Sequence, residues 1–356
     1  MGIRGLTGWI RWVMGEQPKA VDWSQWKGKK IGVDILGFLY KAKAQHYSPL
    51  LYLAKMIVAF KKHDIIPVPI FDGKPPDEKR DALKQRSALR IESETKKQIL
   101  MNDMEHVTMT DEQRNVVVTA LKTLELNASY LTSDERDEAK QLFYAAGIIP
   151  LNATGEADNV LAYFSKRGDL DAIISNDLDL LARGVKILLV PENYALPGDS
   201  SGWHPYILPD ILAKAAITYP QFVDMCVLMG CDYTVGHKVL PYKSAYWSIK
   251  YGLGIESALK KHDITHMEKY KKAAEILCGM YETTDTLMGS KQWEKIQVAP
   301  PKCESETLLT FRKTHLRSIS DSEFEWLGLN CFHSAIDDSA SDTSCQCGCP
   351  DTIAAY

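Results

Sequence analysis

The chain has 356 residues, of which 45% are apolar and 25% are charged, a composition typical of a soluble globular protein. No apolar run approaches the roughly 18 residues that a membrane span requires, and the N-terminus lacks the apolar core of a secretory signal. The net charge of −4 argues at first against a nucleic-acid partner, but cations bound at a carboxylate-lined site would cancel several negative charges locally. The eight cysteines show no C-x-x-C spacing, so we expect an intracellular protein with reduced thiols.

Two apolar segments near the N-terminus each lead to an aspartate. Lys29–Ile35 is a predicted strand that contains Asp34, and a lone buried carboxylate must be paired or must face a cation. The segment 65–71 is a second predicted strand that ends at Asp72, before a turn rich in Gly and Pro. Taken alone, Asp72 could be only a turn former. Tyr40 follows the first strand on a predicted helix, where a core or surface aromatic is the ordinary interpretation.

A long polar helix is predicted from Asp77 to about Met104. Eight Lys and Arg residues lie between positions 74 and 97. Four of them share one helix face because they are separated by seven, four and seven residues: Lys79, Arg86, Arg90 and Lys97. A helix of mixed charge is usually just a solvated face. A basic stripe directly after a strand-end acid suits phosphate contacts better.

Two shorter helices follow the polar helix. Thr110-Asp-Glu-Gln113 resembles a capping box and predicts a helix that reaches about Leu126. Ser133 opens the next helix, which ends at Ala146-Gly147, and Ile148–Leu151 is a short predicted strand.

The segment 154–182 carries four carboxylates at the two ends of one small unit. Thr154-Gly155 predicts a helix start, Gly168 ends that helix, and Asp171–Ser175 is a short strand. Helix starts and strand exits are where an open α/β sheet presents its ligand-binding groups, here Glu156, Asp158, Asp177 and Asp179. Favourable interaction with the helix dipole, worth ~0.3–1 kcal/mol each, would explain only the first pair. Oxygen ligands at both ends favour a hard divalent ion such as Mg²⁺ or Mn²⁺.

The C-terminal part begins with a predicted strand at Val185–Val190 and a loop-rich segment at 191–209. Pro220–Met229 reads as a buried helix, and Asp232 lies just after it, either in a helix C-terminal turn or as a further acid of the site. A weak helical segment at 238–251 carries Lys238, Lys243 and Lys250.

The segment 334–344 is rich in Ser and Asp and is expected to be mobile. The spacing of three nearby cysteines is weak evidence for a soft-metal site: Cys345, Cys347 and Cys349.

The alternation of apolar strands and helices predicts an α/β fold with a mostly parallel sheet and helices on both faces. The strand ends of such a sheet would gather seven acids in one cleft: Asp34, Asp72, Glu156, Asp158, Asp177, Asp179 and Asp232. Because so many carboxylates repel one another, the arrangement favours two bound metal ions, ~3.5–4 Å apart.

Five motifs resemble, in order and with similar spacing, those of the flap endonuclease and XPG-type structure-specific 5′ nucleases. They are Met1-Gly-Ile-Arg-Gly-Leu6, Phe71-Asp-Gly-Lys-Pro-Pro76, Gly155-Glu-Ala-Asp158, Asn176-Asp-Leu-Asp179 and Gly230-Cys-Asp-Tyr233. The resemblance covers about residues 1 to 250. It implies a twisted sheet of the PIN-like 5′ nuclease fold, a helical arch, and a phosphodiesterase that uses two Mg²⁺ ions, for which Mn²⁺ can substitute.

The resemblance also assigns residues to roles. One metal would be held by Asp34, Asp72, Glu156 and Asp158, and the other by Asp177, Asp179 and Asp232. Lys79 and Arg86 match the cations of the arch that polarise the phosphate. Tyr40 matches an aromatic residue that stacks on the nucleotide at the scissile bond, and Gly2 matches an N-terminal residue packed near the active site.

Further DNA contacts are expected from Lys74, Arg90, Lys97, Lys238 and Lys243. The family's helix-two-turn-helix carries a Gly-Ile-Gly-Pro hairpin that grips duplex phosphates with the help of K⁺. Here the corresponding residues are Val239-Leu-Pro-Tyr242, so we expect a divergent version in which lysines contact phosphates without that hairpin. The segment between Asp34 and Asp72 is also shorter than in flap endonucleases. The region that wedges duplex DNA apart is therefore expected to be smaller here.

The expected organisation is a nuclease region in two parts, 1–105 and 106–235, a helical DNA-binding region at 236–330, and a flexible tail at 331–356. The expected substrate is branched or nicked DNA with a free 5′ end, cut by 5′-flap endonuclease and 5′→3′ exonuclease activity during replication or repair. A mainly exonucleolytic, junction-resolving or RNA-directed enzyme is the alternative, and a catalytically decayed DNA-binding scaffold is a third. We expect a monomer in the nucleus or at another site of DNA replication, with no membrane contact and no evident sliding-clamp motif.

Overall fold

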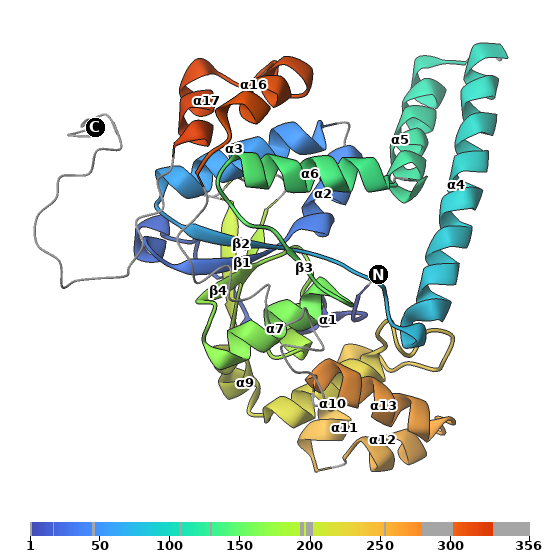
Figure 1. Ribbon diagram of the computed structural model, residues 1–356. Helices are drawn as coiled ribbons and strands as arrows, with labels where there is room; N and C mark the ends of the chain where they lie inside the picture. The colour runs from blue at the N-terminus through green and yellow to red at the C-terminus, as the bar shows by residue number, and fades with distance from the viewer. Residues whose placement is uncertain are drawn as a thin grey trace, which may run out of the picture.

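The structure is a computed structural model that describes residues 2–16, 18–44, 47–106, 109–128, 130–192, 196, 202–252, 254–279 and 302–329. A six-stranded sheet lies at its centre (Figure 1), in the order β3-β2-β1-β4-β5-β6. The strands are β1 Lys30–Asp34, β2 Ile66–Phe71, β3 Leu151–Asn152, β4 Ala172–Ile174, β5 Ile187–Pro191 and β6 Trp203–Ile207. The first five strands pair in parallel, which confirms the predicted mostly parallel sheet.

Strand β6 lies within the segment 191–209, which was predicted to be loop-rich and for which no strand was expected. It pairs antiparallel with β5 at the edge of the sheet, with Pro205 opposite Leu189. Proline lacks the N–H that a central strand needs, and is therefore tolerated mainly at sheet edges. Because of Pro205 the sequence did not predict this edge strand, although its other residues include the strand formers Trp203, Tyr206 and Ile207.

Helices cover both faces of the sheet (Figure 1). Their bounds, together with the 3₁₀ turns η1 and η2, are α1 Leu6–Met14, η1 Trp23–Trp26, α2 Ile35–Ala44, α3 Pro49–Lys62, η2 Asp77–Lys79, α4 Arg80–His106, α5 Asp111–Ala128, α6 Ser133–Ala145, α7 Ala157–Arg167, α8 Asp179–Ala182, α9 Leu208–Ala215, α10 Tyr219–Met229, α11 Tyr242–Lys250, α12 Ile255–Lys261, α13 Met267–Cys278, α16 Ser305–Thr314 and α17 Asp321–Gly328.

Two apolar cores lie on opposite faces of the sheet because successive strand residues point to opposite sides. Ile173 belongs to the core shared with α1, α7 and α10, whereas its neighbour Ile174 belongs to the core shared with α2, α3 and α6. Gly32 in β1 allows α7 to pack closely, since an added Cβ would lie 2.6 Å from Leu161 Cδ2. The carboxyl ends of the five parallel strands, β1 to β5, lie along one edge of the sheet.

The predicted polar helix is present, with a different beginning. Residues 77–79 form the turn η2, and α4 begins at Arg80. Figure 1 shows α4 and α5 side by side as an arm that stands away from the sheet, in the place of the expected helical arch. The start of α5 is capped as predicted, because Thr110 Oγ1 accepts from Gln113 N at 3.3 Å and Gln113 Oε1 accepts from Thr110 N at 3.0 Å.

The C-terminal helices occupy two places (Figure 1). Helices α10 to α13 cluster on the opposite side of the sheet from α3. Helices α16 and α17 pack against α6 and α3. No single described helix is long and apolar enough to cross a membrane, although the bent pair α9 and α10 together passes that test by length and composition. The expected mobile tail at 331–356, with its three clustered cysteines, lies outside the described residues.

Candidate active site

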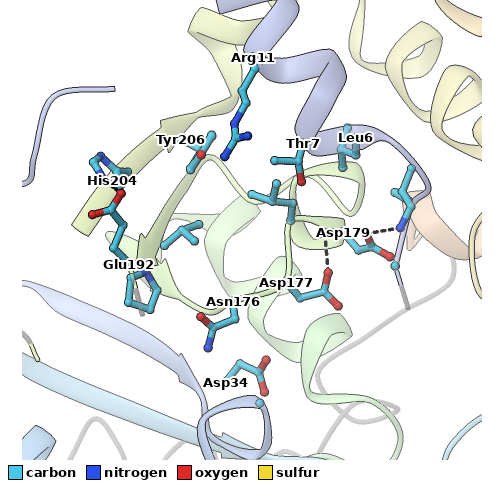
Figure 2. Close-up of a pocket in the computed structure, with 16 residues that line it drawn as sticks. Leu6, Thr7, Arg11, Asp34, Asn176, Asp177, Asp179, Glu192, His204 and Tyr206 are labelled. Atoms are coloured by element: carbon cyan, nitrogen blue, oxygen red, sulfur yellow. Dashed lines mark hydrogen bonds and ion pairs between the residues drawn. The ribbon is translucent and has the colours of Figure 1, made fainter. Parts of the chain in front are cut away.

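The seven predicted acids lie at the carboxyl edge of the sheet or on the loops around it. Asp34 is the last residue of β1, Asp72 follows β2, and Asp177 follows β4. Glu156 and Asp158 begin α7, Asp179 begins α8, and Asp232 follows α10. Figure 2 shows Asp34, Asp177 and Asp179 on one side of a cavity of about 620 Å³, which is lined on the other side by residues of β6 such as His204 and Tyr206.

Backbone and hydroxyl donors hold these carboxylates in place. Asp72 Oδ1 accepts from the backbone N–H of Ala157 at 2.6 Å, which joins the end of β2 to the start of α7. Asp34 Oδ2 accepts from Ser175 Oγ at 2.8 Å, across the β1–β4 pair. Asp179 Oδ1 accepts from the N–H of Ile3 at 2.7 Å, so the N-terminus of the chain forms part of the site.

The carboxylates are close enough to raise one another's proton affinity. Burial raises the pKa of Asp34 to about 7, and repulsion from Asp72 and Asp177 adds to the effect. Burial also raises the pKa of Asp179 to about 8, with further repulsion from Asp177 and Asp232. The pKa of Asp158 is raised as well, first by burial and then by Asp34 and other acids of the cluster. Such crowding of buried carboxyl groups indicates that their negative charge exceeds the positive charge nearby.

Two cations at the base of the arm compensate part of this charge. Lys79, on η2, forms an ion pair with Glu156 and lies 3.2 Å from Asp232. Arg86, six residues after the start of α4 at Arg80, forms an ion pair with Asp232. The structure places Lys79 and Arg86 in contact with carboxylates of the cluster, and their predicted role toward a phosphate stays a prediction.

A third cation, Arg183, was missed by the sequence analysis. It follows α8, is only 4% exposed, and donates from Nη2 to Glu156 Oε2 at 2.9 Å and to Tyr233 Oη at 2.6 Å. Its Nε lies 3.8 Å from Asp158 Oδ2. Burial would raise the pKa of Glu156, but Arg183 and Lys79 outweigh it and lower that pKa to about 2. The available signal was an arginine that directly follows the apolar Leu-Leu-Ala of a buried helix.

The donor set of the cluster fits a hard divalent cation. All seven groups are carboxylates. Burial first, and then repulsion by neighbouring acids, raises the pKa values of Asp34 and Asp179, and a bound cation would favour their charged forms. Within the described ranges, however, no three Asp, Glu, His or Cys side chains form a ready-made metal site. Glu156 and Asp232 form ion pairs with the chain's own Lys79, Arg86 and Arg183.

The structure places two of the predicted substrate-contacting residues beside the acids. A methyl group on Gly2 would lie 2.9 Å from Asp179 Oδ1, so only glycine fits there without displacing that carboxylate. Tyr40, on α2, is 39% exposed and lies close enough to Asp72 for that charge to contribute to its raised pKa, whose main cause is burial.

The other predicted DNA-contacting residues lie farther out and several make contacts within the protein. Lys74 is exposed in the turn after β2. On α4, the Arg90 guanidinium lies 4.8 Å from the ring centre of Tyr130, and Lys97 lies 3.2 Å from Glu94. Their roles remain predictions.

The two lysines of the divergent hairpin region are also engaged. Lys238 Nζ donates to the carbonyl of His262 at 2.6 Å, and Lys243 Nζ lies 5.8 Å from the ring centre of Trp12. In place of the family's hairpin, Leu240 N–H donates to the Leu228 carbonyl at 2.8 Å, and α11 begins directly after Pro241. A phosphate contact by either lysine remains a prediction.

Comparisons with known proteins agree with this geometry. The sequence profile of the XPG N-terminal domain matches residues 1–93, and that of the XPG I-region matches residues 147–232. The chain is 29% identical to flap endonuclease 1 of Brugia malayi over 300 residues, which are 77% of this chain and 74% of that protein.

Solved structures show the same fold. Flap endonuclease-1 of Methanococcus jannaschii superposes with a TM-score of 0.59 at 19% identity, over 89% of this chain and 97% of that one. The Holliday junction-resolving enzyme GEN1, in complex with product DNA, Mg²⁺ and Mn²⁺ ions, gives a TM-score of 0.56 at 15% identity, over 87% of this chain and 73% of that one. Both matched profiles contain acids of the cluster. The chain therefore belongs to the flap endonuclease and XPG-type family of structure-specific 5′ nucleases.

Proposed function

We propose that the protein hydrolyses phosphodiester bonds in branched or nicked DNA near a free 5′ end, with two Mg²⁺ ions as cofactors and Mn²⁺ as a substitute. The observation that carries this proposal is the cluster of seven carboxylates at the carboxyl edge of the sheet, flanked by Lys79 and Arg86. The similarity to flap endonuclease 1 over 77% of the chain supports the choice of substrate.

The carboxylates divide by position into two groups. Those from β1, β2 and α7 would hold one ion and those after β4 and α10 the other: Asp34, Asp72, Glu156 and Asp158, then Asp177, Asp179 and Asp232. When bound, the two ions supply Lewis-acid stabilisation of phosphate oxygens and a water nucleophile at neutral pH. The presence of Mg²⁺ and Mn²⁺ in the structure of GEN1 supports this choice of metals.

The role of the chain's own cations is to neutralise the reacting phosphate. In the structure Lys79 and Arg86 form ion pairs with Glu156 and Asp232. Glu156 and Asp232 would help to hold the divalent ions, and Lys79 and Arg86 would then be available to a phosphate that enters beside them. A fixed cation beside a phosphate stabilises the charge that develops in the transition state.

Tyr40 and the arm would position the DNA. An exposed aromatic ring near the acids offers a stacking surface for the base next to the scissile bond. Arg90 and Lys97, farther along α4, would contact backbone phosphates and contribute affinity without sequence preference. We also propose that the protein works as a monomer inside the cell at sites of DNA replication, which sedimentation and imaging of a fluorescent fusion would test.

A panel of end-labelled DNA substrates tests the proposal. Nicked, 5′-flap, double-flap, four-way and RNA-primed substrates are incubated with Mg²⁺ or with EDTA, and the product lengths are read. We expect Mg²⁺-dependent cleavage within a few nucleotides of the flap junction. Single-nucleotide products would instead favour a mainly 5′→3′ exonuclease. Symmetrical cuts in the four-way substrate would favour a junction-resolving enzyme, and cleavage of the RNA-primed substrate alone would favour an RNA-directed nuclease. Binding without any cleavage would leave only a DNA-binding scaffold.

A further inference from the structure

Arg183 differs from the other two cations of the site in where it comes from. Lys79 and Arg86 lie at the base of the arm, and their side chains are 14% and 39% exposed. The side chain of Arg183 is 5% exposed and enters the cluster from the core, between α7 and α10. A guanidinium is protonated at every pH at which a protein folds, so its charge cannot be lost by titration.

The two oxygens of Glu156 have partners of different kinds. Oε2 accepts from Arg183 Nη2 at 2.9 Å and from Tyr233 Oη at 2.6 Å, and both donors are buried. Oε1 accepts from Lys79 at the base of the arm. Arg183 therefore holds Oε2 of Glu156 from the buried side. Oε1 faces the more exposed Lys79, which another cation could replace.

Arg183 is itself held rigidly in this orientation. Its Nη1 donates to Asn159 Oδ1 on α7, and its Nη2 donates to Tyr233 after α10. Its Nε has no hydrogen-bond partner among the described residues and lies 3.8 Å from Asp158 Oδ2. The guanidinium thus spans Glu156 and Asp158, the pair that begins α7.

We propose that Arg183 is a built-in counter-cation of the carboxylate cluster, which orients Glu156 through Oε2 and weakens the binding of divalent ions by its fixed positive charge. The cluster has seven carboxylates, so one permanent cation lowers its maximum negative charge to six. The inference rests on the proposed function only where it takes the cluster to bind divalent ions. Arg183 is accordingly a positioning residue, since it acts on the ions through Glu156 and Asp158.

A purely structural role makes a different prediction. If Arg183 only joined α7 to α10, its removal would destabilise the protein equally with and without divalent ions. If its charge tunes the site, a neutral replacement leaves an uncompensated carboxylate that a divalent ion can neutralise. The lost stability then returns as the ion concentration rises, because a ligand that binds only the folded state stabilises it.

The test uses the full chain without DNA and Mn²⁺ as the probe. Arg183→Met and Arg183→Gln remove the charge, Arg183→Lys retains it, and Arg167→Met removes an arginine whose side chain is 47% exposed. Calorimetric titration measures Mn²⁺ affinity, and thermal unfolding measures Tm against Mn²⁺ concentration. We expect both neutral variants to have a lower Tm without ions, a larger rise of Tm with Mn²⁺, and roughly tenfold to hundredfold tighter Mn²⁺ binding than wild type. Arg183→Lys and Arg167→Met should bind Mn²⁺ with nearly wild-type affinity.

Other results overturn the inference. Wild-type or weaker Mn²⁺ affinity in both neutral variants, with a Tm deficit that is the same at every Mn²⁺ concentration, would leave Arg183 a structural role alone. Neutral variants that do not fold without ions should fold when Mn²⁺ is added, and failure in both conditions contradicts the proposal. If wild type binds Mn²⁺ but cuts none of the DNA substrates, the proposed function fails while this inference stands. If wild type binds no Mn²⁺, both fail.

Discussion

The carboxyl groups of the cluster differ in pKa because they differ in burial and in the charges beside them. Asp34 and Asp179 have raised pKa values because burial disfavours their charged forms and neighbouring acids repel them. Glu156 is the exception, with a pKa lowered to about 2, because Arg183 and Lys79 outweigh its burial. One cluster therefore contains a permanently charged carboxylate beside others that need a further cation.

Asp177 is the acid whose removal should separate chemistry from binding. Its Oδ1 accepts from the N–H of Asp179 at 2.9 Å, so Asp177→Asn keeps the side-chain shape and an acceptor but removes one charge. We expect the cleavage rate with Mg²⁺ to fall by ~10²–10³-fold or more, with flap affinity little changed. Single-turnover cleavage and a binding assay in Ca²⁺ measure the two effects.

The matched control is Asp137→Asn, since Asp137 lies on α6 with a side chain that is 63% exposed. Cleavage by this variant should be unchanged. A wild-type cleavage rate in Asp177→Asn would show that the charge of Asp177 is not needed for catalysis.

Lys79 should act on the chemical step rather than on affinity. Its amine already lies between Glu156 and Asp232, where the reacting phosphate is expected to enter. Lys79→Ala should slow single-turnover cleavage by ~10²–10³-fold, the usual effect of losing one electrostatic contact to the transition state. Lys96→Ala is the control, because the Lys96 side chain is 60% exposed and pairs with Glu92 along its own helix. Equal rates for the two variants would show that Lys79 does not touch the phosphate.

Buried polar contacts join elements that are distant in the sequence. Lys61, near the end of α3, is 2% exposed, and its Nζ donates to the carbonyls of Ala146 at 2.9 Å, Leu327 at 2.7 Å and Leu329 at 2.7 Å. These carbonyls belong to the ends of α6 and α17. One amine thus satisfies helix-end acceptors that would otherwise lack donors.

Lys61→Met should loosen this junction because the apolar side chain fills the space but leaves the carbonyls without a donor. An unsatisfied buried acceptor costs about 1–3 kcal/mol, so we expect the free energy of unfolding to fall by ~2–4 kcal/mol. Urea unfolding followed by circular dichroism measures it. The neighbouring Lys62 is exposed, and Lys62→Met should change stability by less than about 0.5 kcal/mol. If the two variants are equally stable, the carbonyls do not depend on Lys61.

The stability of the whole molecule should depend on pH through a group outside the acid cluster. Asp224, on α10, accepts from the backbone N–H of Ile255 at the start of α12, yet burial raises its pKa from 3.8 to about 6. Between these two values the folded state holds a proton that the unfolded state has released. Stability therefore falls as the pH rises from about 4 to about 6 and is level above that range.

Asp224→Asn removes this group's titration. We expect the variant to lose less stability than wild type between pH 4 and pH 6 and to be the more stable of the two at pH 7, as measured by urea unfolding at each pH. Asp263→Asn is the control, since Asp263 lies at the surface after α12 and has a left-handed backbone that asparagine also accepts. If the free energy of unfolding changes with pH identically in wild type and in Asp224→Asn, groups other than Asp224 cause that change.

Local patterns made much of the fold and of the site predictable. The alternation of strands and helices, and the strand-end positions of Asp34, Asp72 and Asp177, were readable because periodicity and turn chemistry act over a few residues. The edge strand β6 was missed because Pro205 is a local breaker, and only its pairing with β5 reveals a strand. The exact start of α4 differed because residues 77–79 form a 3₁₀ turn.

The sequence by itself determined which residue types stand at the strand ends, and so the family and its carboxylate chemistry. Tertiary structure alone decided which cations meet those carboxylates. Arg183 lies 27 positions from Glu156, and Lys61 lies 266 positions from Leu327. No spacing rule links such pairs, because their contacts form only when packed helices and strands exclude water and bring distant polar groups together. In that environment an unpaired charge is costly, and each buried group must therefore find its partner in space.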